Sequence, residues 1–257
     1  GRTLGAASLS AKRLSQPEFA PYPGHVHEAE FNNIESVKSL ISEYTAGIFI
    51  EPVQGEGGIY PADREFLREL RALCDENNIV LVFDEIQSGM GRLGTLFAYE
   101  SFGVEPDIIC LAKGMGSGFP VGAMMARKKI SSHFTPGSHG TTYGGNPMAA
   151  HVAYTVISIL SDNEFLKNVN RQSEYLLTGL ERLRQEVAMI SDLRGMGLMI
   201  GIEVTCDIKQ ALARLRENKL LATQAGKNTI RLTPPLILEQ DQANHAIDIL
   251  EKTLHEF

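Results

Sequence analysis

Two short apolar runs in this chain each stop at a charged residue. Ile79–Phe83 runs into Asp84, and Ile108–Ala112 runs into Lys113. Runs of this length are typical of strands that are buried on both faces of a parallel or mixed sheet. A charge at the point where such a strand stops lies at the carboxyl edge of the sheet, where open α/β sheets bind ligands. The sequence therefore predicts one carboxylate and one amine in the same crevice.

The segments around these two runs alternate between helical and strand patterns. In chain order we expect a helix over Asn33–Tyr44, a strand over Ala46–Ile50, a loop over Glu51–Pro61, a helix from an N-cap at Asp63 to about Asn77, a strand over 121–126 and a loop over 136–147. This alternation predicts an α/β domain.

The second part of the chain has a different pattern. A long helical stretch begins near Met148, is broken near Ser161–Asn163 and ends near Val187. After it we expect a strand over Gly197–Val204, a helix over Ile208–Asn218, a strand over Thr229–Leu232 and a helix over Glu239–Leu254. This α+β pattern places a domain boundary near residue 160, between a domain of residues 1–160 and one of residues 161–257.

Charge and cysteine content exclude several classes of protein. Lys and Arg number 24 against 31 Asp and Glu, a net charge of −7, whereas nucleic-acid-binding proteins carry a basic excess. No apolar run reaches the roughly 18 residues of a membrane span, and the first residues lack the apolar core of a secretory signal. Cys74, Cys110 and Cys206 are odd in number and far apart, which favours free thiols in a reducing compartment over a zinc site. We therefore expect a cytoplasmic protein that holds no metal.

Lys113 is the strongest candidate for a catalytic residue. Gly114, Gly116 and Gly118 flank it, so a flat ligand can approach the amine without steric obstruction. A lysine that loses solvent has a lowered pKa and becomes a nucleophile toward carbonyls. The alternative is a solvated lysine, which is the commoner state of this residue type.

Asp84 has two interpretations as well. It could cap a helix or close a turn, or it could be a buried anion that pairs with a cation, because charge burial is costly without a partner. A protonated pyridine ring supplies such a cation, and a lysine together with an aspartate is typical of pyridoxal phosphate sites. Gln87 could then donate to the phenolic oxygen of the ring, whereas Glu85 is compatible with a purely structural role.

Four segments resemble the class III (ornithine and acetylornithine type) aminotransferases. In chain order they are EPVQGEGG, VFDEIQSGMGRLGTLFAYE, DIICLAKGMGSGFPVGA and HGTTYGGNP, and GRTLGA and IRLTPPL near the two ends also fit. The resemblance covers nearly the whole chain. It implies an α/β fold of fold type I, with a large domain that binds pyridoxal 5′-phosphate on a mixed, mostly parallel sheet with flanking helices. A smaller C-terminal α+β domain follows.

The resemblance also implies which residues hold the cofactor. Lys113 would form the Schiff base and carry the proton, and Asp84 would pair with the pyridine nitrogen. Glu85 and Ile86 would adjoin the cofactor, and Gln87 would contact its phenolic oxygen. Thr142 would donate to the cofactor phosphate bound in the neighbouring subunit of a homodimer.

Four further residues would bind substrates under the same resemblance. Arg2 would bind the α-carboxylate of the amino donor, and Thr141 would touch substrate across the dimer interface. Arg231 would bind a carboxylate of 2-oxoglutarate or glutamate, because a guanidinium meets a carboxylate in a bidentate fork. Glu56 would pair with Arg231 when that carboxylate is absent. Without the resemblance, Arg2 could fray at the chain end, Arg231 could form a surface ion pair, and Thr141 could be an ordinary loop residue.

The implied reaction is transfer of the δ-amino group of N2-acetyl-L-ornithine to 2-oxoglutarate, a step of arginine biosynthesis. Transamination of ornithine, succinylornithine or 4-aminobutyrate is also compatible with these 257 residues. A further alternative is an inactive fragment. Members of the family carry an N-terminal portion with a loop for the cofactor phosphate and an aromatic residue that stacks on the ring, and we expect this chain to lack that portion.

Overall fold

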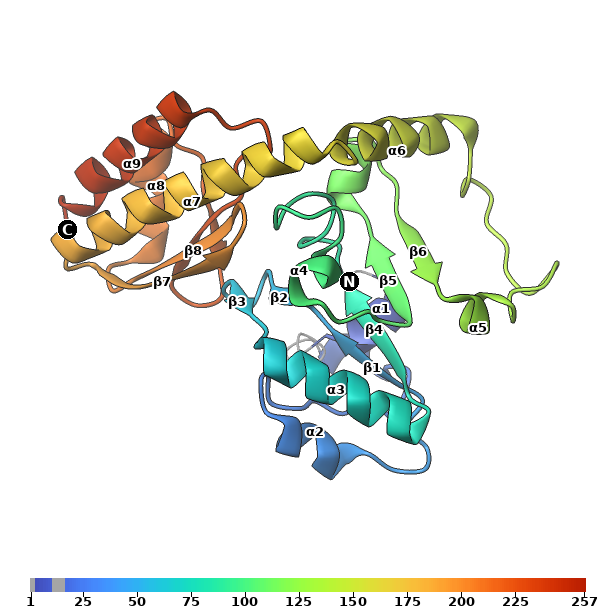
Figure 1. Cartoon of the computed structure of the whole chain (residues 1–257). Helices are drawn as coiled ribbons and strands as arrows, with labels where there is room; N and C mark the ends of the chain where they lie inside the picture. The colour runs from blue at the N-terminus through green and yellow to red at the C-terminus, as the bar shows by residue number, and fades with distance from the viewer. Residues whose placement is uncertain (1–2, 11–16) are drawn as a thin grey trace.

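Two separate sheets, each with its own apolar core, dominate the computed structural model, which describes residues 3–10 and 17–257 (Figure 1). The first sheet has the strand order β1-β4-β5-β6, and its strands are β1 (Gly47–Ile50), β4 (Val80–Asp84), β5 (Ile108–Leu111) and β6 (Ala123–Ala126). The second has the order β7-β8-β10-β9, with β7 (Ile190–Met196), β8 (Met199–Val204), β9 (Thr223–Ala225) and β10 (Thr229–Leu232). A short ribbon of β2 (Val53–Gln54) and β3 (Tyr60–Pro61) links the two regions, because β3 contacts β7.

The helices that surround these sheets vary widely in length. They are α1 (Leu4–Ser8), α2 (Ile34–Leu40), α3 (Arg64–Asn77), α4 (Ala98–Phe102), α5 (Lys128–Ser131), α6 (Pro147–Leu160), α7 (Asn163–Glu186), α8 (Ile208–Glu217) and α9 (Gln240–Leu254), with 3-10 turns η2 (Pro17–Phe19) and η3 (Lys113–Gly116). Within the described residues, none of them is long and apolar enough to span a membrane.

The first sheet is mixed and mostly parallel. Strands β1, β4 and β5 are parallel to one another, and β6 runs antiparallel to β5. In this register Phe83 lies opposite Ile50, and Asp84 lies opposite Cys110. The carboxyl ends of three adjacent strands therefore meet at one edge of the sheet.

The first sheet is most deeply buried at its central strand β4. Leu81 and Phe83 are fully buried in a core that includes the apolar residues of α3 and α4. On the edge strands, by contrast, Phe49 is 52% exposed and Met124 is 49% exposed. The expectation of burial on both faces was made for the runs that form β4 and β5. It holds for β4, whereas in β5 Ile109 and Leu111 are buried and Ile108 and Cys110 are half-buried. The expectation of a buried strand over Ala46–Ile50 is wrong, because β1 is an edge strand of the sheet.

The second sheet is entirely antiparallel, and its two faces differ in chemistry. Ile200, Ile202 and Val204 point to one face and are buried in a core with α7, α8 and α9. Gly201 and Glu203 alternate with them, so they point to the opposite face, toward the ribbon. This second face carries most of the polar groups discussed below.

Several local predictions are confirmed, and others are wrong. The helix after Asp63, the helix break at residues 161–163 and the strand over Thr229–Leu232 form as expected. The segment 51–61, expected to be a loop, contains β2 and β3, and strands β7 and β9 and helix α4 were missed. In β7 the polar side chains serve tertiary contacts, which weakens the apolar alternation that predicts a strand. The domain boundary at residue 160 stays a prediction.

Candidate active site

Three ionisable side chains follow three adjacent strands at the carboxyl edge of the first sheet. Asp84 is the last residue of β4, and Lys113 begins η3 two residues after β5. Glu51 follows β1 directly. Sequence reasoning singled out Asp84 and Lys113 and missed Glu51. The same signal, a charge placed where an apolar run stops, could have found it.

The backbone at Lys113 adopts a conformation that side chains rarely favour. Its φ is +45°, in the left-handed region, and Ser117 at the end of the same turn has a φ of +43°. Such residues cost roughly 1–3 kcal/mol each and persist where the surrounding structure holds them, often at functional sites. The turn is tightly packed, since a Cβ on Gly116 would lie 2.8 Å from Val121 Cγ1. The glycine at position 116 is therefore required by packing.

The surroundings of Lys113 both raise and lower the pKa of its amine. Desolvation makes the largest contribution and lowers the pKa of Lys113, and Arg231 lowers it further, although the residue as a whole is exposed. Glu56, Asp84 and Glu51 raise it, and the net result is a pKa below the ordinary lysine value. A larger fraction of neutral amine follows, which is what a nucleophile toward carbonyls requires.

Asp84 and Glu85 point to different parts of the molecule. Asp84 Oδ1 accepts a hydrogen bond from the Ile86 N–H at 3.0 Å, which fixes the carboxylate at the strand end. Glu85 is buried, and its two oxygens accept from Ala98 N at 2.6 Å and Tyr99 N at 2.9 Å at the start of α4. Burial raises the pKa of Glu85 to about 7. The structure therefore places the Glu85 carboxylate on α4 and not with Asp84 and Lys113.

Glu56, Gln87 and Arg231 form a closed cluster, which we call the carboxylate gate. Arg231 Nη1 donates to Glu56 Oε1 at 2.7 Å and to Gln87 Oε1 at 3.2 Å, and Gln87 Nε2 donates to Glu56 Oε1 at 3.1 Å. The hydrogen bond from Arg231 is the main cause that lowers the pKa of Glu56. Three segments that lie far apart in the sequence thus meet at one carboxylate.

The carboxylate gate adjoins the sheet edge. Its Glu56 and Arg231 are close enough to perturb the amine of Lys113. The backbone at Gly55 packs closely against the Gln87 side chain of the gate, because a Cβ on Gly55 would lie 2.5 Å from Gln87 Cδ. In this arrangement the Gln87 amide accepts from Arg231 and donates to Glu56.

The remaining predicted residues lie elsewhere. Arg2 falls outside the described residues. Thr141 and Thr142 are exposed in the chain between α5 and α6, which projects away from both sheets (Figure 1). Thr141 Oγ1 accepts from Gly144 N at 3.2 Å. Within residues 3–10 and 17–257, no hydrogen bond joins either threonine to the carboxylate gate or to the sheet edge.

The donor set at this edge fits a particular kind of ligand. An amine with a lowered pKa and a carboxylate stand at the ends of neighbouring parallel strands. A flat aromatic cofactor that carries a carbonyl and a basic ring nitrogen would present the carbonyl to the amine and the nitrogen to the carboxylate. The arginine of the adjoining gate suits a substrate carboxylate. The arrangement can therefore support chemistry on an amine or a carbonyl of an acidic substrate.

Comparisons with known proteins identify the family of the chain. The family model described as aminotransferase class-III matches residues 1–254. The acetylornithine aminotransferase of Clostridium acetobutylicum is 48% identical over 255 residues, which cover 99% of this chain and 66% of that protein. The chain thus spans slightly less than two thirds of the length of this curated relative.

Two solved structures are similar over most of the chain. The N-acetylornithine aminotransferase of Stenotrophomonas maltophilia is 36% identical with a TM-score of 0.82, over 91% of this chain and 64% of that one. The ornithine aminotransferase of Toxoplasma gondii, crystallized in the presence of oxidized glutathione with partial occupancy of PLP at its active site, is 30% identical with a TM-score of 0.93. That match covers 100% of this chain and 62% of that one.

Proposed function

The chain belongs to the class-III aminotransferases, which have the fold-type I architecture, and on that premise we propose that it moves the δ-amino group of N2-acetyl-L-ornithine to 2-oxoglutarate. Members of this family act on an amino donor and a keto acid with pyridoxal 5′-phosphate. The proposed products are N-acetylglutamate semialdehyde and glutamate, formed in the cytoplasm as a step of arginine biosynthesis. The observation that carries the proposal is the pair of strand ends at Asp84 and Lys113, beside a gate with an arginine for the second substrate.

Asp84 and Lys113 would have separate roles at the cofactor, Asp84 at the ring nitrogen and Lys113 at the carbonyl. When bound, pyridoxal phosphate supplies a carbonyl that combines with amines and a protonated ring that takes up the electron pair released at the substrate carbon. The Asp84 carboxylate would keep the ring nitrogen protonated. Lys113 Nζ would hold the cofactor carbonyl until the substrate amine displaces it, and would then move the proton at the substrate carbon, a task that its lowered pKa suits.

The carboxylate gate would let one site accept two different substrates. Arg231 would bind a carboxylate of 2-oxoglutarate or glutamate in place of Glu56. When the δ-amine donor is bound, Glu56 would close on Arg231 as it does in this structure and neutralise a cation that has no substrate carboxylate to meet. Arg2 would bind the α-carboxylate of acetylornithine.

A homodimer would complete the site. Thr142 would donate to the cofactor phosphate in the neighbouring subunit, and Thr141 would touch its substrate. The projecting, exposed course of the segment that carries both threonines supports a role outside the chain's own site. So do the exposed apolar side chains of Phe49, Met124 and Met148, which a partner surface would cover.

A rapid-mixing experiment on the full chain tests this proposal. The chain reconstituted with pyridoxal phosphate should show a visible absorbance band that is lost in Lys113→Ala and kept in Lys128→Ala, a matched change on α5. In single turnover, acetylornithine should discharge the band faster than ornithine or 4-aminobutyrate. Equal rates with all three would refute the choice of donor, and the absence of a band would favour the inactive fragment.

A further inference from the structure

The loop of residues 55–60, which carries Glu56, lies on the polar face of the second sheet. Arg194 of β7 is the register partner of Gly201 of β8, and Gly201 is the register partner of Arg231 of β10. The two arginines therefore stand in one row, with a glycine between them. We call residues 55–60 the clamped loop.

Ile59 is seated in the middle of this row. A Cβ on Gly201 would lie 2.9 Å from Ile59 Cβ, so the isoleucine occupies the space that the glycine leaves. Ile59 has 0% exposure and a φ of +59°, which is a genuine outlier for a β-branched residue. Such strain persists only when surrounding contacts hold the backbone in place. The clamped loop therefore needs support on both sides of Ile59.

Arg231 of β10 and Gly226, in the turn between β9 and β10, hold the part of the loop that precedes Ile59. Arg231 Nη1 donates to the Gly55 carbonyl at 3.3 Å as well as to Glu56. The Gly226 N–H donates to the Glu56 carbonyl at 2.7 Å. The Arg231 contacts are the ones that a substrate carboxylate would compete for under the proposed function, so this support is weakened when substrate binds.

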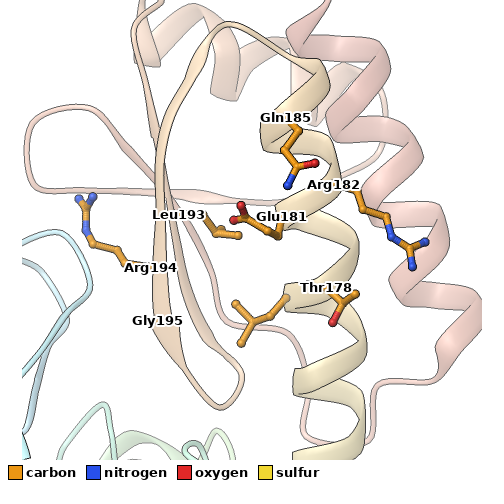
Figure 2. Close-up of a pocket in the computed structure, with 8 residues that line it drawn as sticks. Thr178, Glu181, Arg182, Gln185, Leu193, Arg194 and Gly195 are labelled. Carbon is orange, nitrogen blue, oxygen red and sulfur yellow. The ribbon is translucent and has the colours of Figure 1, made fainter.

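Arg194 contacts the two residues that flank Ile59, Gly58 and Tyr60. Its Nε donates to the Gly58 carbonyl at 2.8 Å, and its guanidinium lies 4.0 Å from the centre of the Tyr60 ring. Figure 2 shows Leu193 directed toward α7 and Arg194 directed away from it, to the other side of β7. The guanidinium is fixed there by its other acceptors, which are Asp192 at 2.7 Å, Thr229 at 2.9 Å and Glu203.

The side chains of the two arginines are equally buried, 12% exposed at Arg194 and 13% at Arg231, and in this structure both donate to acceptors of the protein. Under the proposed function they differ, because a substrate carboxylate would compete for Arg231 and leave the acceptors of Arg194 in place. We propose that Arg194 is a positioning residue that keeps the clamped loop seated on the second sheet, so that Glu56 meets Arg231 in the same place each time the carboxylate gate closes. This inference rests on the proposed function for what the gate does, whereas the seating of the loop can be tested without it.

Two variants and one matched control test the inference on the full chain. Arg194→Met removes the guanidinium, and Arg194→Lys keeps the charge but loses the fork. Arg184→Met is the control, since Arg184 is an exposed residue of α7 that pairs with Glu181 on the same helix. Carbon-13 NMR follows the titration of the Glu56 carboxyl, and amide hydrogen exchange follows Gly226 N, with Leu81 N on β4 as a distant reference.

Arg231 holds the pKa of Glu56 below its ordinary value, so loss of seating should move that pKa back toward the ordinary value in Arg194→Met. Exchange at Gly226 should rise about tenfold with no change at Leu81, since the opening is local. Arg194→Lys should fall between Arg194→Met and the wild type, and Arg184→Met should match the wild type. An unchanged Glu56 titration overturns the inference, and so does equally faster exchange at Leu81.

A kinetic comparison tests the link to the gate. Glutamate brings its own carboxylate to Arg231, whereas the δ-amine donor needs Glu56 there. In Arg194→Met the kcat/KM for acetylornithine should fall about tenfold relative to that for glutamate, the size expected for one lost hydrogen bond to a charged group. An equal fall for both donors overturns the link. If the wild type transfers no amino group, the proposed function fails, while the NMR and exchange results still decide the seating.

Tyr60→Leu provides a second route if Arg194→Met does not fold. It removes the ring beneath the guanidinium and leaves the partners of Arg194 on the second sheet in place. The same titration and exchange changes should appear, about half as large, because cation–π contacts are worth roughly 0.5–1 kcal/mol at exposed sites. Wild-type behaviour at both Glu56 and Gly226 in this variant would count against Arg194 as the holder of the loop.

Discussion

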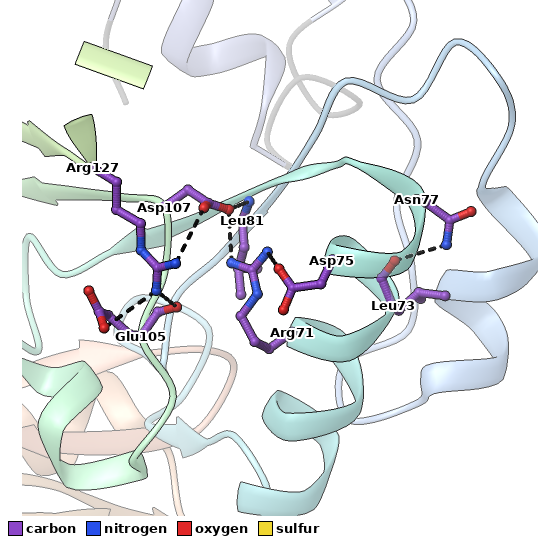
Figure 3. Close-up of polar contacts among 8 residues, drawn as sticks. All are labelled: Arg71, Leu73, Asp75, Asn77, Leu81, Glu105, Asp107 and Arg127. Carbon is purple, nitrogen blue, oxygen red and sulfur yellow. Dashed lines mark hydrogen bonds and ion pairs between the residues drawn. The ribbon is translucent and has the colours of Figure 1, made fainter. Parts of the chain in front are cut away.

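The two ends of the first sheet carry similar residue types and use them in opposite ways. At the amino edge, Asp107 Oδ2 accepts from Leu81 N at 2.9 Å and from Arg71 Nη1 at 2.8 Å, and Arg127 closes the same cluster (Figure 3). At the carboxyl edge, within the described residues, no ion pair joins Asp84 to Lys113. The same strands thus begin in a network of ion pairs and hydrogen bonds and end in charges that are not paired with each other.

The pKa shifts at the two ends express this difference. Burial alone would raise the pKa of Asp107, but the Leu81 N–H and the Arg71 guanidinium outweigh it and lower that pKa. Burial raises the pKa of Glu51 at the other end, and the Gly55 N–H does not offset it. Charges at the amino edge therefore contribute to stability, whereas those at the carboxyl edge remain available for a ligand.

Lys113→Ala should give the largest effect and should act on function alone. Turnover of the chain reconstituted with pyridoxal phosphate should fall by roughly 10³-fold or more, because one group both holds the cofactor and moves the proton. Its free energy of unfolding in urea should stay within about 1 kcal/mol of the wild type, since the side chain is exposed. Retained turnover would remove the contrast between the two edges.

Asp84→Asn and Asp107→Asn make the same chemical change at the two ends. Asp84→Asn should lower kcat by about 10²-fold, the cost typical of removing one electrostatic group from an active site. Urea unfolding should change little, and kcat should be measured at saturating cofactor. A loss of stability equal to that of Asp107→Asn would show that the two edges do not differ.

Asp107→Asn should instead lower the free energy of unfolding by about 2–4 kcal/mol, because it leaves the guanidinium of Arg71, only 15% exposed, without its half-buried carboxylate partner. The turnover of the folded fraction should stay the same. Asp75→Asn is the control, since this exposed partner of the same arginine should contribute less than about 1 kcal/mol. Equal losses in the two variants would show that the ion pair of Asp107 with Arg71 contributes no more than the exposed one of Asp75.

Glu85→Gln should give the smallest effect, a change in how stability depends on pH. The pKa of Glu85 is raised to about 7 by burial, so its contribution is present at low pH and is lost as pH rises toward 7. Relative to Glu85→Gln, the wild type should lose on the order of 1–3 kcal/mol between pH 5 and pH 8. Parallel pH profiles of urea unfolding for the wild type and Glu85→Gln would contradict this. Glu105→Gln, a change at an exposed residue, is the control.

Part of the candidate site could be read from local pattern. Asp84 and Lys113 each end a run of apolar residues, and neighbouring strand ends share an edge wherever a parallel sheet forms. Glu51 follows the same rule and was missed because it opens a glycine-rich segment. Local pattern failed at β7, whose Arg194 points to the polar face, and at the segment 51–61, where the ribbon is too short to show a period.

The sequence by itself determined the strand ends that bring Asp84 and Lys113 to one edge, because periodicity and motif are properties of nearby residues. Only the tertiary structure decided that Glu56, Gln87 and Arg231 meet, and that Gly201 leaves room for Ile59 between two arginines. Apart from the bond between Glu56 and Gln87, these contacts join residues separated by more than a hundred positions. They depend on how two sheets face each other, which no local pattern encodes.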